Sequence, residues 1–272
     1  MNILIIGGSR NIGYYSAIRF LDAEHTVTFL LRKASVFDLD ARIQTALNSG
    51  KAQLVQGDAL VKEDVQRAWT SAIAHGKSGS VDLLLFTVGG EPSFSLTKGF
   101  ALSPPNLVTQ CLLNTITTLP DLQTRIIVIT SVGLTRSSRA ELPAPLKPLY
   151  AWVLHPAHRD KIGVERLIAH CAGWEWNDNE DGKIHPGILA DDWKDTSGLP
   201  SQGSVQEVMV IRPGLLTDGD CLADTPGGQK YRVSEDELGG WTVSRRDVAH
   251  FVVDVAMGRW SEFYKRRVNI MY

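Results

Sequence analysis

The sequence predicts an α/β protein with a doubly wound parallel sheet of about seven strands and helices on both faces. Short runs rich in β-branched residues and leucine recur along the chain, and amphipathic stretches of helix length separate them. The 272 residues contain no internal repeat and no linker rich in glycine, serine or proline. We therefore expect a single domain over residues 1–272.

The predicted elements follow one another in a regular alternation. Ser103 followed by Pro104 marks one helix start, and Ser244 with Asp247 three residues later has the spacing of a capping box. A helix is also expected near 156–172. The expected strands lie near residues 2–6, 26–31, 52–55, 81–86, 125–130, 207–211 and 266–270.

Composition and charge exclude several classes of protein. With 28 Lys and Arg against 30 Asp and Glu, the formal net charge of −2 provides no drive to bind nucleic acid or an anionic membrane. A strand beginning at Asn2 leaves no room for a secretory leader, and no apolar run reaches the roughly twenty residues that span a bilayer. The three cysteines are far apart and lack metal-binding spacing. We expect a cytoplasmic protein.

Residues 174–204 interrupt the alternation with seven acidic residues, two lysines and three tryptophans. Connections of this length are uncommon in compact domains. We favour a surface excursion held down by its tryptophans over a docking surface for a protein partner or a second copy. A lid over the active site is disfavoured because the segment begins near the amino edge of the sheet, whereas ligands bind at the carboxyl edge.

A glycine-rich segment follows the first strand and opens a helix. Glycines there allow a sharp turn and a close approach of the backbone to a pyrophosphate, which then lies at the positive end of the helix. The alternative is a tight turn without a ligand. The segment is Gly7, Gly8, Ser9, Arg10, Asn11, Ile12 and Gly13, and it predicts a dinucleotide site of the Rossmann type.

The residue types after the second strand favour NADP(H) over NAD(H). Arg32 and Lys33 stand where an acidic residue would accept a hydrogen bond from the ribose 2′-hydroxyl. Together with Arg10 they suit a 2′-phosphate, although each could be a solvated surface residue.

The next two strands end in further candidate cofactor contacts. Asp58, followed by Ala59, could accept a hydrogen bond from the adenine amino group or cap a helix. After the fourth strand, Thr87, Val88 and Gly89 provide small residues where the nucleoside passes the backbone, with a plain turn as the alternative.

In these features the chain resembles an atypical short-chain dehydrogenase/reductase, the group that includes the NmrA-like regulators and the biliverdin/flavin reductases. The resemblance spans most of the chain, and the segment Gly7 to Gly13 is similar to the GATGNIG loop of that family. Other matching positions are Asp58, Ser131 after Thr130, Arg212-Pro213-Gly214, and the late helix start at 244–249. The resemblance implies bound NADP(H), with Pro213, Gly214 and Leu215 passing the nicotinamide.

The catalytic residues of the main short-chain family are only partly present. Lys161 matches the lysine of Tyr-x-x-x-Lys, but Ala157 occupies the tyrosine position. We expect Lys161 to hold the nicotinamide ribose in preference to a catalytic role. The proton donor is left open between His158, Tyr150 and water, with a helix-start histidine and a pocket-wall tyrosine as the structural alternatives.

The end of the strand near 125–130 provides a second candidate catalytic group. Ser131 could hydrogen-bond a substrate oxygen or the nicotinamide amide, or simply cap the strand. No metal is expected, because His155 and His158 have no third ligand nearby.

Segments 90–103, 132–156 and 215–243 leave the carboxyl edge and should wall the substrate pocket. Their large apolar residues are Phe94, Leu134, Tyr150, Trp152 and Trp241.

The prediction is an NADPH-dependent oxidoreductase that transfers hydride to a conjugated or aromatic small molecule. The alternative is a non-catalytic NADP(H)-binding redox sensor that acts through a protein partner. An isomerase or epimerase using NAD is disfavoured by Arg10, Arg32 and Ala157.

Overall fold

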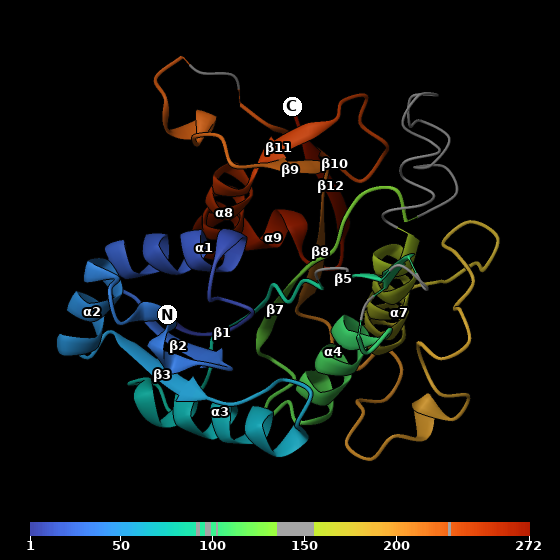
Figure 1. Ribbon diagram of the computed structural model, residues 1–272, viewed down its shortest axis with the longest axis horizontal. Helices are drawn as coiled ribbons and strands as arrows, with labels where there is room; N and C mark the ends of the chain where they lie inside the picture. The colour runs from blue at the N-terminus through green and yellow to red at the C-terminus, as the bar shows by residue number, and fades with distance from the viewer. Residues whose placement is uncertain (91–92, 96–98, 102, 135–154, 228–229) are drawn as a thin grey trace.

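The computed structural model describes residues 1–90, 93–95, 99–101, 103–134, 155–227 and 230–272. The strands of its main sheet are β1 (Asn2–Ile6), β2 (Thr26–Leu31), β3 (Ala52–Gln56), β4 (Leu83–Phe86), β7 (Arg125–Ile129), β8 (Val208–Pro213), β10 (Arg232–Ser234) and β12 (Arg267–Met271). They lie in the order β10-β12-β8-β7-β4-β1-β2-β3 (Figure 1). The seven strands expected from the sequence are all present and pair in parallel.

The middle strands are continuous apolar runs because helices cover the sheet on both sides. Every residue of β1 and β8 is buried, the pattern typical of parallel sheets. From β1 the chain first adds strands toward β3 and then returns to add β4, β7, β8 and β12 on the other side. The strand order therefore reverses between β1 and β4, the place where ligands bind at the carboxyl edge of doubly wound sheets.

The structure adds one strand to the predicted sheet and two small sheets beside it. The added strand, β10, pairs antiparallel with β12 at the edge, and its three residues are too few to show a period in the sequence. The pair β5 (Ser93–Ser95) and β6 (Gly99–Ala101) is antiparallel, and β9 (Leu215–Thr217) pairs in parallel with β11 (Thr242–Ser244). Segment 215–243, expected as a loop region on the substrate side, thus contributes β10 to the edge of the main sheet, and β9 and part of β11 to a small sheet.

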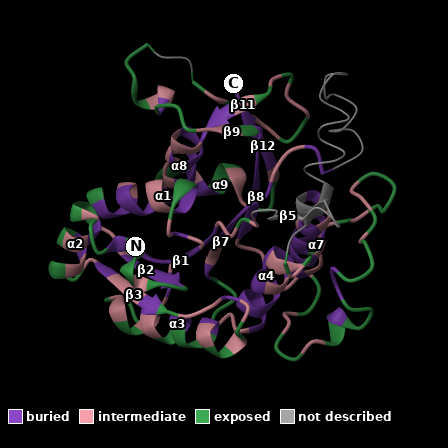
Figure 2. Ribbon diagram, viewed as in Figure 1, coloured by how far each residue is buried: buried purple, intermediate pink, exposed green. Residues whose placement is uncertain are grey.

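Two groups of helices cover the two faces (Figure 1). On one face lie α1 (Asn11–Asp22), α2 (Ala41–Asn48), α8 (Arg245–Asp254) and α9 (Trp260–Phe263), and on the other lie α3 (Lys62–His75), α4 (Leu107–Thr117) and α7 (His155–Ala172). Figure 2 shows buried strands between helices whose outer surfaces are exposed. Within the described ranges, no helix is long and apolar enough to cross a membrane.

One of the two expected helix starts is confirmed. Ser244 caps α8, and its hydroxyl accepts a hydrogen bond from the Asp247 amide at 2.9 Å. The other start was placed too early: α4 begins at Leu107, with Asn106 in the capping position, so the turn at Ser103 and Pro104 precedes the helix by three residues. Proline and serine mark turns as readily as helix starts, which explains the offset.

Residues 174–204 run along the outer side of α4 and α7. Trp193 is buried against the ring of His170, whereas Trp174 and Trp176 flank the guanidinium of Arg267. Ile188 packs so closely on α7 that a side chain at Gly163 would meet it at 2.4 Å. All three tryptophans of the segment therefore contact the chain's own residues.

Candidate functional site

The turn between β1 and α1 is packed so tightly that only glycine fits at two of its positions. Gly7 has a φ of +93°, and a Cβ there would lie 2.6 Å from the carbonyl carbon of Thr87. A Cβ at Gly13 would lie 2.5 Å from the Thr87 hydroxyl oxygen, and that hydroxyl donates a hydrogen bond to the Gly7 carbonyl at 3.1 Å. The end of β4 therefore supports the turn.

The amino end of α1 is suited to an anion. Its first turn contains no acidic residue, and no side chain within the described chain caps it. The free amide groups and the helix dipole then favour a negatively charged ligand such as a pyrophosphate. Because this helix start lies at the point where the strand order reverses, the residues fit the dinucleotide expected from the sequence.

Three exposed cationic residues surround the adjacent strand end. Arg32 and Lys33 follow β2, whose register places Leu30 beside Ile6 of β1, and Arg10 precedes α1. At the end of β3, Asp58 accepts a hydrogen bond from the Leu60 amide at 3.0 Å. That bond closes a turn before α3 (Lys62–His75), whose capping position is Val61, so Asp58 does not cap this helix. It occupies one of the two carboxylate oxygens.

A buried charge cluster lies at the carboxyl ends of β7 and β8. The Glu165 carboxylate on α7 pairs with the Arg212 guanidinium of β8, whose Nε donates at 2.9 Å. The same carboxylate accepts a hydrogen bond from the Thr130 hydroxyl at 2.8 Å. The Lys161 ammonium, one turn earlier on α7, donates to the Thr130 carbonyl oxygen at 2.9 Å.

The electrostatics of this cluster follow from burial and pairing. Burial alone would raise the pKa of Glu165, but the charge and hydrogen bonds of Arg212, with the hydrogen bond of Thr130, lower it below its usual value. Burial lowers the pKa of Lys161 to about 8, although Glu165 and Asp160 oppose the shift. The cluster therefore holds a firmly ionised carboxylate beside an amine that titrates near neutral pH.

Ser131 lies next to this cluster, directly after Thr130. Its hydroxyl oxygen is buried and has no hydrogen-bond partner among the described residues. The Val132 amide donates to the Pro213 carbonyl at 3.0 Å, which joins this strand end to the turn after β8. A buried hydroxyl without a partner is costly unless a ligand satisfies it, so Ser131 is suited to bind one.

The turn after β8 carries exposed apolar surface. The Leu215 amide donates to the Trp241 carbonyl at 2.7 Å, and a Cβ at Gly214 would meet the same oxygen at 2.7 Å. The residues Leu215 and Trp241 are 49% and 46% exposed, although both are large and apolar. This turn is joined to the strand end at Ser131 by the hydrogen bond of Val132 with Pro213, so Leu215 and Trp241 expose apolar surface after the strand next to β7.

Of the other predicted site residues, some are buried and some lie outside the described part of the chain. His158 is buried on α7, and Leu134 is buried after β7. The site positions Tyr150 and Trp152 lie outside the described residues, as does the side chain of Phe94. In the part of the chain that is described, no cluster of residues could hold a metal ion.

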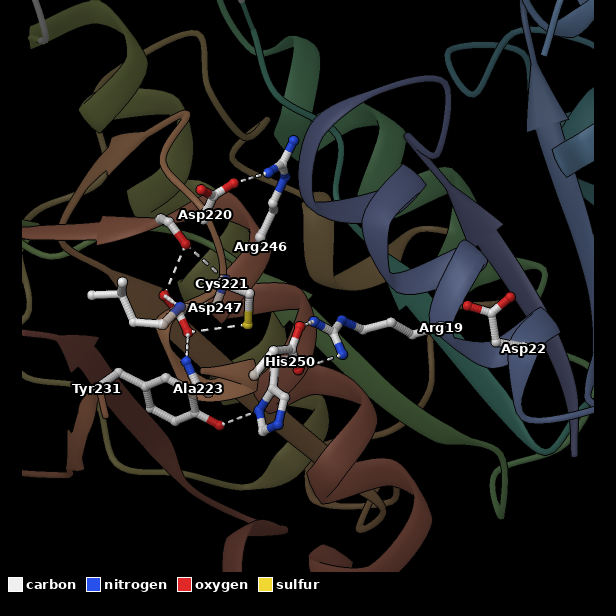
Figure 3. A network of polar contacts seen from close by, with 12 residues as sticks. Arg19, Asp22, Asp220, Cys221, Ala223, Tyr231, Arg246, Asp247 and His250 are labelled. Atoms are coloured by element: carbon white, nitrogen blue, oxygen red, sulfur yellow. Dashed lines mark hydrogen bonds and ion pairs between the residues drawn. The ribbon is translucent and has the colours of Figure 1, made fainter. Parts of the chain in front are cut away.

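The late helix start forms a clamp that holds the segment after β9. Asp247 accepts a hydrogen bond from the Ala223 amide at 2.9 Å, and the Cys221 thiol lies 3.2 Å away (Figure 3). It also accepts a hydrogen bond from the Tyr272 hydroxyl at 2.5 Å. Burial raises the pKa of the Cys221 thiol to about 12, so this cysteine is no nucleophile at neutral pH. Asp247 therefore joins three distant segments of the chain and has a structural role.

Sequence reasoning did not identify the pairing of Glu165 with Arg212 and Thr130, nor the Asp247 clamp. A signal for the pair was present, because Arg212 is a charged residue in an otherwise apolar buried strand and such a charge needs a partner. The sequence contained no comparable signal for the clamp, whose members are brought together only by folding.

Two clefts lie elsewhere on the protein. One, of about 500 Å³, lies along α1 beside Asp220 and Arg246, and the other, of about 440 Å³, lies between α4 and segment 174–204. Neither is lined by Ser131 or Lys161. In the first cleft, Arg19 forms an ion pair with Asp224 and Arg246 forms one with Asp220. These charged side chains are therefore already paired with one another.

Comparisons with known proteins agree with this geometry. No protein-family model matches the chain. The Reductase pytE of Aspergillus terreus is 27% identical over 231 residues, which is 80% of this chain and 77% of that protein. The anaerobilin reductase ChuY of Escherichia coli O157:H7 has a similar structure, with 20% identity, a TM-score of 0.60 and coverage of 99% of this chain and 96% of that one.

A short-chain dehydrogenase/reductase from Serratia marcescens has 17% identity and a TM-score of 0.57, over 99% of this chain and 95% of that one. These likenesses show that the chain has the Rossmann-type fold of a solved short-chain dehydrogenase/reductase, and they agree with the resemblance noted in the sequence. The curated relative is named as a reductase.

Proposed function

We propose that this protein is an NADPH-dependent reductase that transfers hydride to a conjugated or aromatic small molecule. The observation that carries the proposal is the shared position of two features, the glycine turn before α1 and the buried Ser131 hydroxyl, which has no partner among the described residues. Both lie at the carboxyl edge, on strands that β4 separates. The relatives named as reductases support the same class of reaction.

Each part of the dinucleotide has a candidate contact. The start of α1 would hold the pyrophosphate, and Arg10, Arg32 and Lys33 would hold a 2′-phosphate. Lys161 would hold the nicotinamide ribose, and the nicotinamide would supply a hydride when bound.

The substrate side combines one polar group with apolar surface. Ser131 would donate its hydrogen bond to an oxygen of the acceptor, and the exposed faces of Leu215 and Trp241 would contact a flat ring system. With Ala157 in place of the usual tyrosine, the chain lacks a phenol on α7 at that position. A conjugated acceptor suits such a site, because it can spread the charge that a hydride brings.

The test is a fluorescence titration of the purified protein with NADPH and with NADH, followed by an acceptor panel. The panel contains menadione, FMN and cyclohexenone, and the loss of NADPH absorbance is followed without oxygen. We expect tighter binding of NADPH than of NADH and oxidation of at least one acceptor. Tight NADPH binding with no oxidation would reject the reductase and favour the redox sensor.

A further inference from the structure

The Lys161 ammonium makes fewer hydrogen bonds than it can. An ammonium has three N–H groups, and the bond to the Thr130 carbonyl uses one of them. The nearest carboxylate, Glu165, is occupied by Arg212 and by the Thr130 hydroxyl, so within the described residues no carboxylate hydrogen-bonds the ammonium. Lys161 keeps some accessible surface. Counting only partners among the described residues, two of its N–H groups therefore remain for a ligand.

Lys161 binds the strand end that carries the candidate substrate contact, Ser131. The carbonyl that it binds belongs to Thr130, the residue directly before Ser131. The buried Ser131 hydroxyl also lacks a partner within the described chain. The carboxyl end of β7 therefore offers two hydrogen-bond donors at consecutive residues, the Lys161 ammonium at Thr130 and the hydroxyl of Ser131.

We propose that Lys161, besides holding the nicotinamide ribose with one N–H group, donates from another the proton that completes the reduction, with Glu165, Arg212 and Thr130 as the positioning residues that hold it. This inference rests on the proposed function. As an enone or quinone accepts a hydride from bound NADPH, the electron pair of the hydride leaves a negative charge on the acceptor oxygen. One N–H bond of Lys161 breaks and an O–H bond forms, which leaves a neutral amine that solvent reprotonates.

The environment of Lys161 supports this role. Burial lowers its pKa to about 8 from the usual value of 10.5, so its proton is released far more readily than that of an exposed lysine. The neighbouring carboxylates on α7 are Asp160 and Glu165, and Asp160 accepts the amides of Val108 and Thr109 at the start of α4.

Other titratable and charged groups surround the cluster. His158 lies on α7 itself, Arg212 on β8 and Arg267 on β12, and Asp181 and Glu237 act on Arg212 from the segments outside the sheet. Because Glu165 stays ionised and Arg212 stays protonated across neutral pH, Lys161 is the member of the buried cluster that titrates there.

The experiment compares Lys161→Arg with the wild-type protein. Arginine keeps the positive charge but cannot release a proton at these pH values. The exposed Lys77→Arg variant is the matched control. For each protein we would measure NADPH affinity by fluorescence, and the rate of menadione and cyclohexenone reduction across the pKa of Lys161. Lys161→Met is the second variant, which removes the charge as well.

A direct readout of the amine accompanies the kinetics. Competitive labelling with acetic anhydride, followed by mass spectrometry, gives the pKa of Lys161 without any turnover. We expect a labelling midpoint near 8, and a wild-type rate that falls as the pH rises through the same value. Lys161→Arg should lower the rate about 100-fold and remove this pH dependence, with NADPH affinity changed only a few-fold.

The positioning role has its own readout. Glu165→Gln removes a charge that raises the pKa of Lys161, so both the labelling midpoint and the alkaline fall in rate should move to lower pH. A purely structural role would leave both unmoved.

The outcomes separate the two proposals. If the wild type binds NADPH but reduces no acceptor, the proposed function fails and the proton donor fails with it. If it reduces an acceptor and Lys161→Arg keeps the rate and its pH dependence, only the assignment of Lys161 is wrong.

Discussion

Replacing Glu165 by glutamine should destabilise the protein far more than a surface change of the same kind. The Glu165 side chain is 1% exposed and that of its partner Arg212 is 10% exposed, so the variant leaves a buried guanidinium without its counter-charge. Breaking a buried pair in this way costs about 3–5 kcal/mol. At about 2 °C per kcal/mol for a chain of this size, the melting temperature should fall by about 6–10 °C.

The matched control is Glu235→Gln. The ion pair of Glu235 with Arg266 has side chains that are 52% and 49% exposed, and such pairs contribute about 1 kcal/mol or less. Urea denaturation followed by circular dichroism at neutral pH measures both variants against the wild type. If the two variants lose the same stability, the reasoning from burial is refuted.

The pH dependence of the same variant gives a second check. The pKa of Glu165 is lower in the folded protein than its usual value of about 4.3. Its contribution to stability is therefore fully present above that usual value and is lost as the pH falls through the lower, folded-state pKa. The difference in unfolding free energy between wild type and Glu165→Gln should shrink in this acid range, and a constant difference would contradict the pairing.

Three further predictions concern the cofactor site and the thiols. Gly13→Ala should abolish measurable NADPH binding in the fluorescence titration, because its Cβ would lie 2.5 Å from the Thr87 hydroxyl, whereas Gly258→Ala, which meets nothing within 4 Å, should bind normally. Replacing Arg32 and Lys33 together by alanine should weaken NADPH binding about tenfold or more without changing NADH binding, and an equal loss for both nucleotides would argue against a 2′-phosphate contact. Burial raises the pKa of each of the three free cysteines to about 12, so iodoacetamide at about pH 8 should label none of them in the native protein and all of them in urea. Rapid native labelling would show that a cysteine is accessible.

The sequence predicts those parts of the fold whose signals lie in neighbouring residues. Runs rich in β-branched residues and leucine marked all seven parallel strands, and they are most nearly continuous in the middle strands, which helices cover on both faces. The short edge strand β10 was missed, because three residues carry no period. The glycine turn was identified for a similar reason: its residues are consecutive, and the need for positive φ at Gly7 is a property of the backbone itself.

The candidate site was only partly predictable because its contacts join residues that lie far apart in the sequence. Lys161 was identified through the resemblance to the short-chain family, but its hydrogen bond to the Thr130 carbonyl and its lowered pKa depend on how the chain folds around it. The pairing of Glu165 with Arg212 joins positions 47 residues apart.

The sequence by itself thus determined the parallel sheet, the glycine turn and the positions of the charged residues along the chain. Only the tertiary structure decided which of those charges are buried, which partner each one has, and that the Ser131 hydroxyl has none among the described residues. The physical reason is that hydrogen-bond partners and desolvation depend on packing between distant segments, whereas strand and turn signals depend on neighbouring residues.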